Sequence, residues 1–267
     1  MKKIKRLATY FAVWKIFGFN AMQTTFVNRG SNLLFMIGKV IRLTMSLVFL
    51  YLIRENITNF AGYTVDQMIV FFLTYQFIDL LSQVFYRGVY MFGNLIRKGN
   101  FDFLLSKPIN PLFRALTGRP DINDAIFIVP TTLISLYILT NLEITITLQS
   151  ALLYAVLLVN SFLIATALHI LVLVVGVLTT EVDGIIWIYR DLNHLSRFPV
   201  GIYMEPFRFA LFFIIPIGMM VTIPTEILLG LRPTYSIFLA TGVGIGSFLV
   251  SLKLWNWALK KYSSASS

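Results

Sequence analysis

The side chains that could do chemistry in this chain lie inside or beside apolar segments. Acid–base chemistry needs a carboxylate or a histidine held close to a second polar group, and the candidate bases are Asp79 and His194. The spacing pairs neither of them with a second carboxylate or histidine. Asp121 and Asp124 are three residues apart, but they begin an apolar segment, where we expect them to cap a helix. The sequence therefore predicts no catalytic site.

The residues for nucleotide and metal chemistry are also missing. Gly38-Lys39 has no glycine five residues upstream and is followed by Val40, so it is not a P-loop. The chain has no Cys, which excludes disulfides and thiolate metal sites, and its 2 His cannot build a zinc site alone. We expect this chain to bind no metal and no cofactor of its own.

Polar residues recur at helical spacing within three of the apolar segments. A charge at bilayer depth costs at least ~2.5 kcal/mol, so such residues are expected to face protein or water and to pair. Arg42 and Asp79 lie at similar depths, roughly 14 Å from one membrane surface at ~1.5 Å per residue, and are predicted to pair. Packing alone or a substrate pathway would explain the stripes, and the sequence leaves both open. The stripes are Asn32, Lys39, Arg42 and Ser46; Gln76, Asp79, Gln83 and Arg87; and Asp183, Arg190, His194 and Arg197.

The segments that carry these residues are long enough to cross a membrane. The chain of 267 residues is 57% hydrophobic and 13% charged, with a mean hydropathy of +0.79, whereas a soluble domain carries about 25% charged residues. Apolar runs near 20 residues match a hydrocarbon core about 30 Å thick. We predict an all-α polytopic membrane protein, a single domain over 1–267 with six transmembrane helices. Five of the spans are 33–53, 66–88, 122–140, 149–178 and 236–258.

The remaining span is ambiguous because two stretches compete for it. Hydropathy selects 207–224, but Pro216 and Pro224 would break a helix there. The preceding stretch, 182–203, is more polar and carries one apolar helical stripe. One stretch is expected to be the fifth span and the other to be interfacial or re-entrant.

The distribution of basic residues predicts the orientation. The net charge of +10 would suggest nucleic acid in a soluble protein, but here the positive-inside bias explains it and no nucleic-acid partner is expected. Lys and Arg gather before the first span, in 87–119 and after the last span, while the loops 54–65 and 141–148 are poor in them. Both termini are therefore expected to be cytoplasmic. Residues 1–25 are predicted to form an interfacial helix rather than a cleaved signal peptide.

A short amphipathic helix is predicted between spans two and three, over 94–107. Apolar residues form a stripe at i, i+3, i+4 and i+7, Gly99-Asn100 interrupts the helix in front, and prolines end it. By periodicity alone this helix could lie on lipid or dock a cytosolic partner. The stripe consists of Phe101, Leu104, Leu105 and Pro108.

Four motifs in order make the chain resemble the permease subunit of type 2 ABC transporters, and more narrowly a bacterial branch of uncharacterised permeases. They are GNFDFLLSKPINPLF at 99–113, RFPVGIY at 197–203, PFRFALFFIIP with PTEILLG across 206–230, and KYSSASS at 261–267. The resemblance spans essentially the whole chain. It implies that 182–203 is the fifth span and that 206–230 is re-entrant from outside, although the fifth span is more polar than the family leads us to expect.

The resemblance also implies a function. The chain would be the membrane-spanning subunit of an ABC exporter in the cell inner membrane, would form the pathway with a second permease, a paralogue rather than an identical copy, and would not be an enzyme. A separate ATPase dimer would bind ATP and Mg and would dock on the coupling helix. The coupling residues would be Asn94, Arg97, Phe101, Asp102, Leu104, Leu105, Lys107 and Pro108.

Two rival functions stay open, and the substrate is not determined. One rival is an ABC-associated regulator that moves no substrate. The other is an intramembrane lipid-modifying enzyme that uses Asp79 or His194 as a base. Drug, peptide, lipid and glycan substrates are all compatible with the sequence.

Overall fold

The computed structural model describes residues 2–54 and 59–263, with side chains from Arg6 onward. Two parts of the predictions lie outside this description. They are the side chains of Lys2, Lys3 and Lys5, which contribute to the basic segment before the first span, and residues 264–267 of the KYSSASS motif. Within it the chain is mostly helical, as the sequence predicts. Five of its helices are long and apolar enough to cross a membrane, and a bent pair could provide a sixth.

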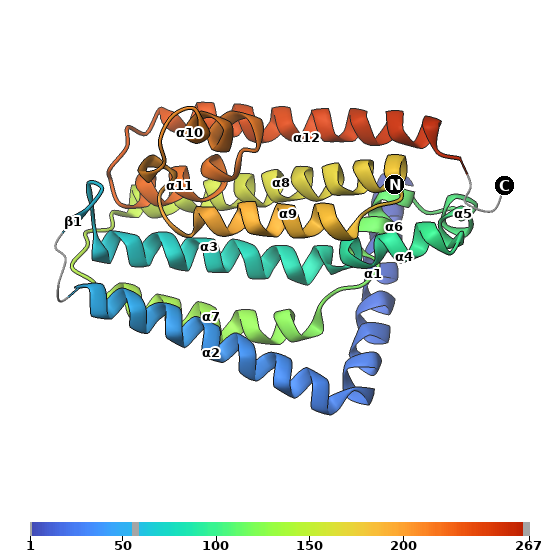
Figure 1. The fold of residues 1–267 in the computed structure, drawn as a ribbon, viewed down its shortest axis with the longest axis horizontal. Helices are drawn as coiled ribbons and strands as arrows, with labels where there is room; N and C mark the ends of the chain where they lie inside the picture. The colour runs from blue at the N-terminus through green and yellow to red at the C-terminus, as the bar shows by residue number, and fades with distance from the viewer. Residues whose placement is uncertain (1, 55–58, 264–267) are drawn as a thin grey trace.

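Long helices run side by side, with α1 crossing one end of the bundle (Figure 1). We call this end, which also holds α4 to α6 and the last turn of α12, the α1 end, and the opposite end, which holds α10 and α11, the α11 end. The predicted spans of 33–53, 122–140, 149–178 and 236–258 fall in α2, α7, α8 and α12 respectively, and the predicted span of 66–88 covers α3 and the first two residues of the 3-10 turn after it. The helices are α1 (Lys2–Val27), α2 (Arg29–Arg54), α3 (Val65–Tyr86), α4 (Phe92–Arg97), α5 (Asn100–Leu105), α6 (Pro111–Thr117), α7 (Ile122–Thr140), α8 (Leu148–Thr179), α9 (Asp183–His194), α10 (Phe207–Phe209), α11 (Ile217–Leu228) and α12 (Ser236–Lys261).

A two-residue β-ladder is the one departure from helix among the described elements. Strands β1 (Asn59–Phe60) and β2 (Tyr63–Thr64) pair antiparallel at the α11 end. Ala61 and Gly62 connect them with φ of 52° and 89°, the left-handed conformation that tight hairpin turns require. Thr64 then caps α3 through a reciprocal capping box with Gln67.

Helix α1 lies across its end of the bundle by packing aromatic side chains on α3 and α6. Tyr10 meets Phe113 at 4.8 Å between ring centroids, and Trp14 stacks on Phe85 at 5.5 Å. The rest of α1 exposes apolar side chains such as Phe11 and Phe19. This arrangement suits a helix that lies along a membrane surface.

The core is organised around α8, which packs against α3, α11 and α12. Close approach to α12 depends on Gly244, because a Cβ there would overlap the side chain of Asn160 on α8. Asn160 also donates through Nδ2 to the carbonyl of Ala240 at 3.0 Å. At the C-terminal end of α8, buried Val182 fills the space beside Gly176 and Gly93. Helix α9 therefore starts tightly wedged against α8 and α4.

The predicted fifth span, 182–203, is not one continuous helix. Helix α9 ends at His194, and two 3-10 turns, Leu195–Arg197 and Val200–Ile202, follow it on either side of Pro199. A proline has no N–H to continue the helical ladder, which explains the break. Helix α9 nevertheless runs from the α1 end alongside α3 and α8 (Figure 1).

The competing stretch is not a straight span either. Phe207–Ile214 and Ile217–Leu228 meet at an angle of 90°, with Pro216 in the break, and both lie at the α11 end. All twelve residues of α11 are buried. Pro224 leaves the carbonyl of Met220, four residues earlier, without its helical donor. Ser161 of α8 places its hydroxyl 2.6 Å from that carbonyl oxygen and 2.7 Å from the carbonyl oxygen of Leu157. Proline-broken backbone is thus accommodated because protein covers it.

Candidate functional site

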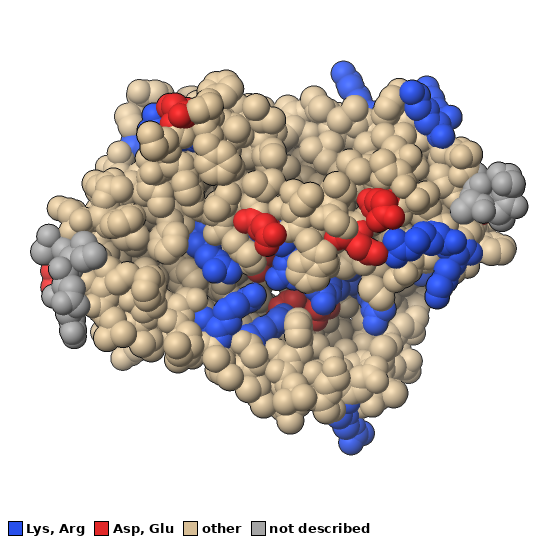
Figure 2. All heavy atoms as spheres, viewed as in Figure 1, with Lys and Arg blue, Asp and Glu red and all other residues tan. Residues whose placement is uncertain are grey.

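A polar cavity of about 340 Å³ lies between α2, α3 and α9, and we call it the α2–α3 cavity. Four cationic and two carboxylate side chains line it. In Figure 2, which views the molecule as in Figure 1, Lys and Arg side chains gather in a hollow in the middle of the molecule. The lining residues are Leu34, Phe35, Gly38, Lys39, Arg42, Asp79, Leu80, Gln83, Arg87, Asp124 and Arg190.

A buried ion pair between Lys39 of α2 and Asp124 of α7 forms one wall of this cavity. The Lys39 side chain is 9% exposed and that of Asp124 is 2% exposed. Sequence reasoning assigned both Asp121 and Asp124 to helix capping. The prediction is confirmed for Asp121, whose carboxylate accepts from the backbone N–H of Asp124 at 3.1 Å. A helix has only one N-cap position, so two aspartates at the start of α7 could not both fill it. The surplus carboxylate, Asp124, was the signal in the sequence for an ion pair with a lysine or arginine of another helix.

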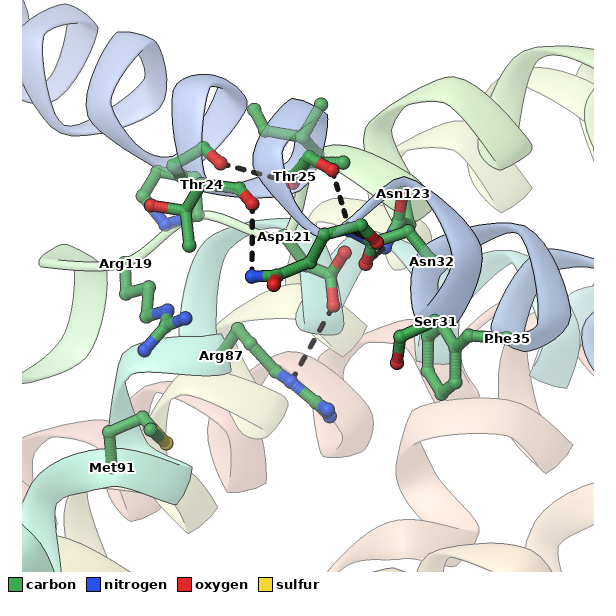
Figure 3. A pocket seen from close by; sticks show the side chains of 14 residues that line it. Thr24, Thr25, Ser31, Asn32, Phe35, Arg87, Met91, Arg119, Asp121 and Asn123 are labelled. Atoms are coloured by element: carbon green, nitrogen blue, oxygen red, sulfur yellow. Dashed lines mark hydrogen bonds and ion pairs between the residues drawn. The ribbon is translucent and has the colours of Figure 1, made fainter.

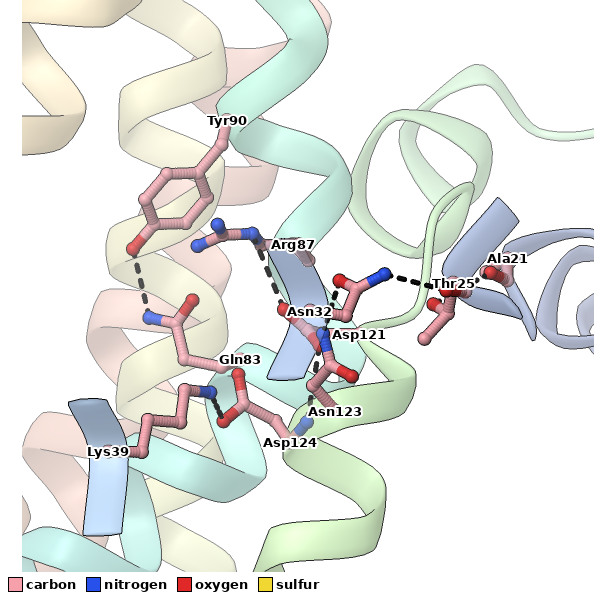
Figure 4. A network of polar contacts seen from close by, with 10 residues as sticks. All are labelled: Ala21, Thr25, Asn32, Lys39, Gln83, Arg87, Tyr90, Asp121, Asn123 and Asp124. Atoms are coloured by element: carbon pink, nitrogen blue, oxygen red, sulfur yellow. Dashed lines mark hydrogen bonds and ion pairs between the residues drawn. The ribbon is translucent and has the colours of Figure 1, made fainter. Parts of the chain in front are cut away.

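Arg87 stands where α3 gives way to a 3-10 turn (Arg87–Met91), and it is held on two sides. Its Nε lies 3.5 Å from Asp121 Oδ2, and its guanidinium lies 4.8 Å from the ring centroid of Tyr90. The Tyr90 hydroxyl in turn accepts from Gln83 Nε2 at 2.9 Å (Figure 4). The second amide atom of Gln83, Oε1, is buried and has no hydrogen-bond partner. A buried amide atom without a partner marks a place where a polar ligand or water would be stabilised.

The predicted pair of Arg42 with Asp79 is wrong as an ion pair, although both residues line the α2–α3 cavity. No ion pair joins them in the described part of the chain. Asp79 Oδ1 instead accepts from the side-chain amide of Asn193 at 3.2 Å. Asn193 is buried where α9 packs against α3. Its side-chain amide therefore contacts the Asp79 carboxylate, and Arg42 does not. Equal depth along two helices fixes the level of two residues but not the rotation of either helix.

The remaining predicted polar residues divide into two groups. Arg190 lines the cavity, and its guanidinium lies 5.3 Å from the ring centroid of Trp187 and 5.8 Å from that of Tyr90. His194 and Arg197 lie outside the cavity lining. His194 Nδ1 is 3.0 Å from Arg197 Nη2 and 2.6 Å from the Tyr75 hydroxyl.

This pairing constrains the chemistry of the candidate bases. A guanidinium can only donate, so Nδ1 of His194 is the acceptor. The hydrogen bond from Arg197 therefore already uses the lone pair of Nδ1, with which His194 would have to accept a proton from a substrate. Gln76 is buried on α3 but does not line the cavity either. Six of the nine predicted pathway residues thus meet in one cavity: Lys39, Arg42, Asp79, Gln83, Arg87 and Arg190.

A second cavity of about 340 Å³ adjoins the first and shares Phe35 and Arg87 with it. It lies where α1 meets α2, and Figure 3 shows Arg87, Arg119 and Asp121 around it. Asn32 of α2 bridges its walls, since its Nδ2 donates to the carbonyl of Thr25 at 2.7 Å and its Oδ1 accepts from Asn123 at 3.0 Å. The two cavities together form a polar cleft that continues toward the α1 end.

The predicted coupling helix, 94–107, is two short helices, α4 and α5. Gly99 separates them with φ of 66°, a left-handed conformation that glycine adopts at little cost. The residues of the predicted apolar stripe differ in burial. Phe101 and Leu104 are buried against the chain itself, while Leu105 is 38% exposed and Phe103, off the predicted stripe, is 68% exposed. Asn94, Arg97, Lys107 and Pro108 are also exposed, and Asp102 is partly exposed.

Two contacts connect the α4–α5 segment to other helices. Phe101 meets Phe92 at 5.1 Å and Trp255 of α12 at 6.4 Å between ring centroids. Arg97 Nη2 lies 2.8 Å from Asp183 Oδ2, in the first turn of α9. A displacement of this segment would therefore act directly on α9 and α12.

A polar cluster at the α11 end was not anticipated from the sequence. Glu226 of α11 is buried, accepts from the Tyr63 hydroxyl at 2.6 Å and forms an ion pair with Arg232. Burial raises the pKa of Tyr63, and the hydrogen bond to Glu226 raises it further. Tyr63 lies 163 residues from Glu226 in the sequence and Arg232 lies beyond the end of α11, so no helical periodicity could have grouped the three.

In the part of the chain that the structure describes, no group of three or more His, Asp or Glu side chains could hold a metal ion. A family model described as ABC-2 family transporter protein matches residues 40–266. No curated protein and no solved structure matches the chain significantly. The matched residues include every helix from α3 to α12, the residues from Arg42 onward that line the α2–α3 cavity, and the α4–α5 segment.

Proposed function

The chain belongs to the ABC-2 transporter family, and on that premise we propose that it is the membrane-spanning subunit of an ATP-driven exporter. The observation that carries the proposal is the extent of the family match, which confirms the resemblance that the sequence motifs predicted. In this proposal two permeases enclose the pathway and a separate ATPase dimer binds ATP and Mg. ATP binding and hydrolysis alternate two packings of the permeases.

The α4–α5 segment is the proposed docking site for the ATPase. Phe103 and Leu105 support this role because they are apolar and exposed on a short segment at one end of the bundle. Phe101 and Leu104 are already used in the fold, so they would support the docking surface rather than contact the partner. The ion pair of Arg97 with Asp183 supplies a direct route from that surface to α9.

The second permease is proposed to cover the face that carries the α2–α3 cavity. Helix α2 supports this placement because most of its length is exposed and apolar, and it forms one edge of the hollow seen in Figure 2. A paralogue is favoured over an identical copy, in line with the resemblance. The α1 end, with its concentration of Lys and Arg, is proposed to be cytoplasmic in the cell inner membrane.

Affinity purification of the full chain from its native membrane, with the co-purifying chains identified, tests the assembly. We expect a P-loop ATPase to co-purify, and its ATPase rate to depend on the permease. Phe103→Asp and Leu105→Asp should each abolish co-purification, because a carboxylate would be desolvated in an apolar interface. Met204→Asp is the matched control, since Met204 is an exposed apolar residue (85% exposed) at the α11 end.

Full ATPase recovery with both α5 variants would refute docking through this segment. Absence of any ATPase would refute the exporter. A regulator that moves no substrate would assemble in the same way, but its ATPase rate would not respond to any substrate in reconstituted vesicles.

A further inference from the structure

We propose that the α2–α3 cavity binds the anionic head group, phosphate in type, of an amphiphilic substrate. This inference rests on the proposed function, since it assigns a substrate class to the exporter. It starts from the charge that the fold leaves unpaired. Of the four cations in the cavity, Lys39 pairs with Asp124 and Arg87 pairs with Asp121 of the adjoining cavity.

Arg42 and Arg190 have no carboxylate partner in the described part of the chain. Asp79, which lines the same cavity, accepts instead from the side-chain amide of Asn193. Even with Asp121 counted, cations exceed carboxylates by four to three around the cavity. Unpaired charge at membrane depth is costly, and a bound anion would offset that cost.

The donor set suits a phosphate-type head group. A guanidinium presents paired N–H groups that match two oxygens of a phosphate or carboxylate. Arg42 approaches from α2 and Arg190 from α9, so an anion between them would connect two helices of the cleft. The rings of Trp187 and Tyr90, with centroids 5.3 Å and 5.8 Å from the Arg190 guanidinium, limit the freedom of this side chain and reduce the entropy that it loses on binding.

The walls beside the charges are apolar, which selects an amphiphile over a free ion. Leu34 lines the cavity and is 71% exposed. Trp187, whose ring centroid lies 5.3 Å from the Arg190 guanidinium, is 57% exposed on α9. The hollow opens on the outer face of the bundle (Figure 2), so a head group in the cavity would leave its alkyl chain along these side chains.

The test uses the full chain alone in phosphatidylcholine nanodiscs, with dodecyl phosphate as the probe. Binding is followed by the fluorescence of Trp187, identified by its loss in Trp187→Phe, and by the unfolding temperature. Dodecylphosphocholine, dodecyltrimethylammonium and inorganic phosphate are the comparison probes. We expect dodecyl phosphate to bind at least about tenfold more tightly than each of them.

Arg42→Gln and Arg190→Gln should each weaken dodecyl phosphate binding about tenfold or more, because each removes a charged hydrogen-bond donor. Arg29→Gln is the matched control on α2, since Arg29 is exposed and lines neither cavity. The unfolding temperature without a probe verifies that each variant is folded. Unchanged binding in both variants, or equally tight binding of the ammonium probe, would overturn the anion site.

Equal binding of inorganic phosphate would overturn the amphiphile, since the apolar wall would contribute nothing. The proposal and the proposed function can fail separately. The binding assay contains no ATPase, whereas the co-purification assay contains no probe.

Discussion

Replacing Asp124 by asparagine removes the carboxylate that pairs with Lys39 and leaves a buried ammonium. Breaking a buried ion pair from one side costs about 3–5 kcal/mol, because the remaining charge stays desolvated. The lower end applies here. The amide oxygen of asparagine still accepts one hydrogen bond, and Lys39 borders a cavity of about 340 Å³ that water can enter. At about 2–4 °C per kcal/mol for a chain of this size, about 3 kcal/mol lowers the unfolding temperature by roughly 6–12 °C.

Thermal unfolding of the purified chain in detergent, followed by tryptophan fluorescence, measures this shift. Lys39→Met added to Asp124→Asn removes the unpaired charge, so the double variant should return to within about 1 kcal/mol of the original chain. Arg208→Gln is the control. It breaks the exposed ion pair with Glu205, whose members are 43% and 54% exposed, and should change little. If Asp124→Asn unfolds at the original temperature, or if the double variant is as unstable as the single one, the pair does not stabilise the fold.

Three further outcomes follow from the packing and the proposed orientation. Gly176→Val should lower the free energy of unfolding by about 1–3 kcal/mol, because the added side chain would force α9 away from α8. Gly246→Val is the control, since the space around Gly246 is open, and it should not have this effect. Equal effects of the two substitutions would contradict the close approach of Val182 to Gly176. Ser161→Ala should cost about 1–3 kcal/mol by leaving the proline-freed carbonyl of α11 buried without a donor, and unchanged unfolding would show that α11 does not need it. In intact cells, a cysteine replacing Phe60 should react with an impermeant maleimide and one replacing Phe103 should not, and the reverse pattern would invert the orientation.

Long apolar helices were predictable from the sequence, while the interrupted ones were not. A run of about 20 apolar residues has few alternatives to a helix at membrane depth, so α2, α3, α7, α8 and α12 follow from composition. The 182–203 segment carries charge and a proline, and only the fold shows that helix stops at His194. The break at Gly99 was visible in the sequence, but its consequence, two helices with Phe101 turned inward, depends on α12 being present to receive that ring.

The candidate site was predictable in its helices but not in its pairs. Periodicity identified the polar faces of α2 and α3, and six of the nine predicted residues line one cavity. It could not predict that α7 would bring Asp124 to Lys39, nor that Asn193 would reach Asp79 first. Such pairs depend on how each helix is rotated against its neighbours. Rotation is fixed by packing across the whole bundle, for example by the valine wedge at the start of α9.

Helix α9 has the contacts needed to connect the two proposed sites. Its first turn is joined to the α4–α5 segment by the ion pair of Asp183 with Arg97. Its middle presents Arg190 to the α2–α3 cavity, and beyond its end the N–H of Val200 donates to Thr222 of α11 at 3.1 Å. Under the proposed function, an ATPase that displaces α4–α5 would therefore move Arg190 relative to Arg42 on α2. Separating the two guanidinium groups would weaken their joint hold on an anion, which would couple ATP use to release of the head group.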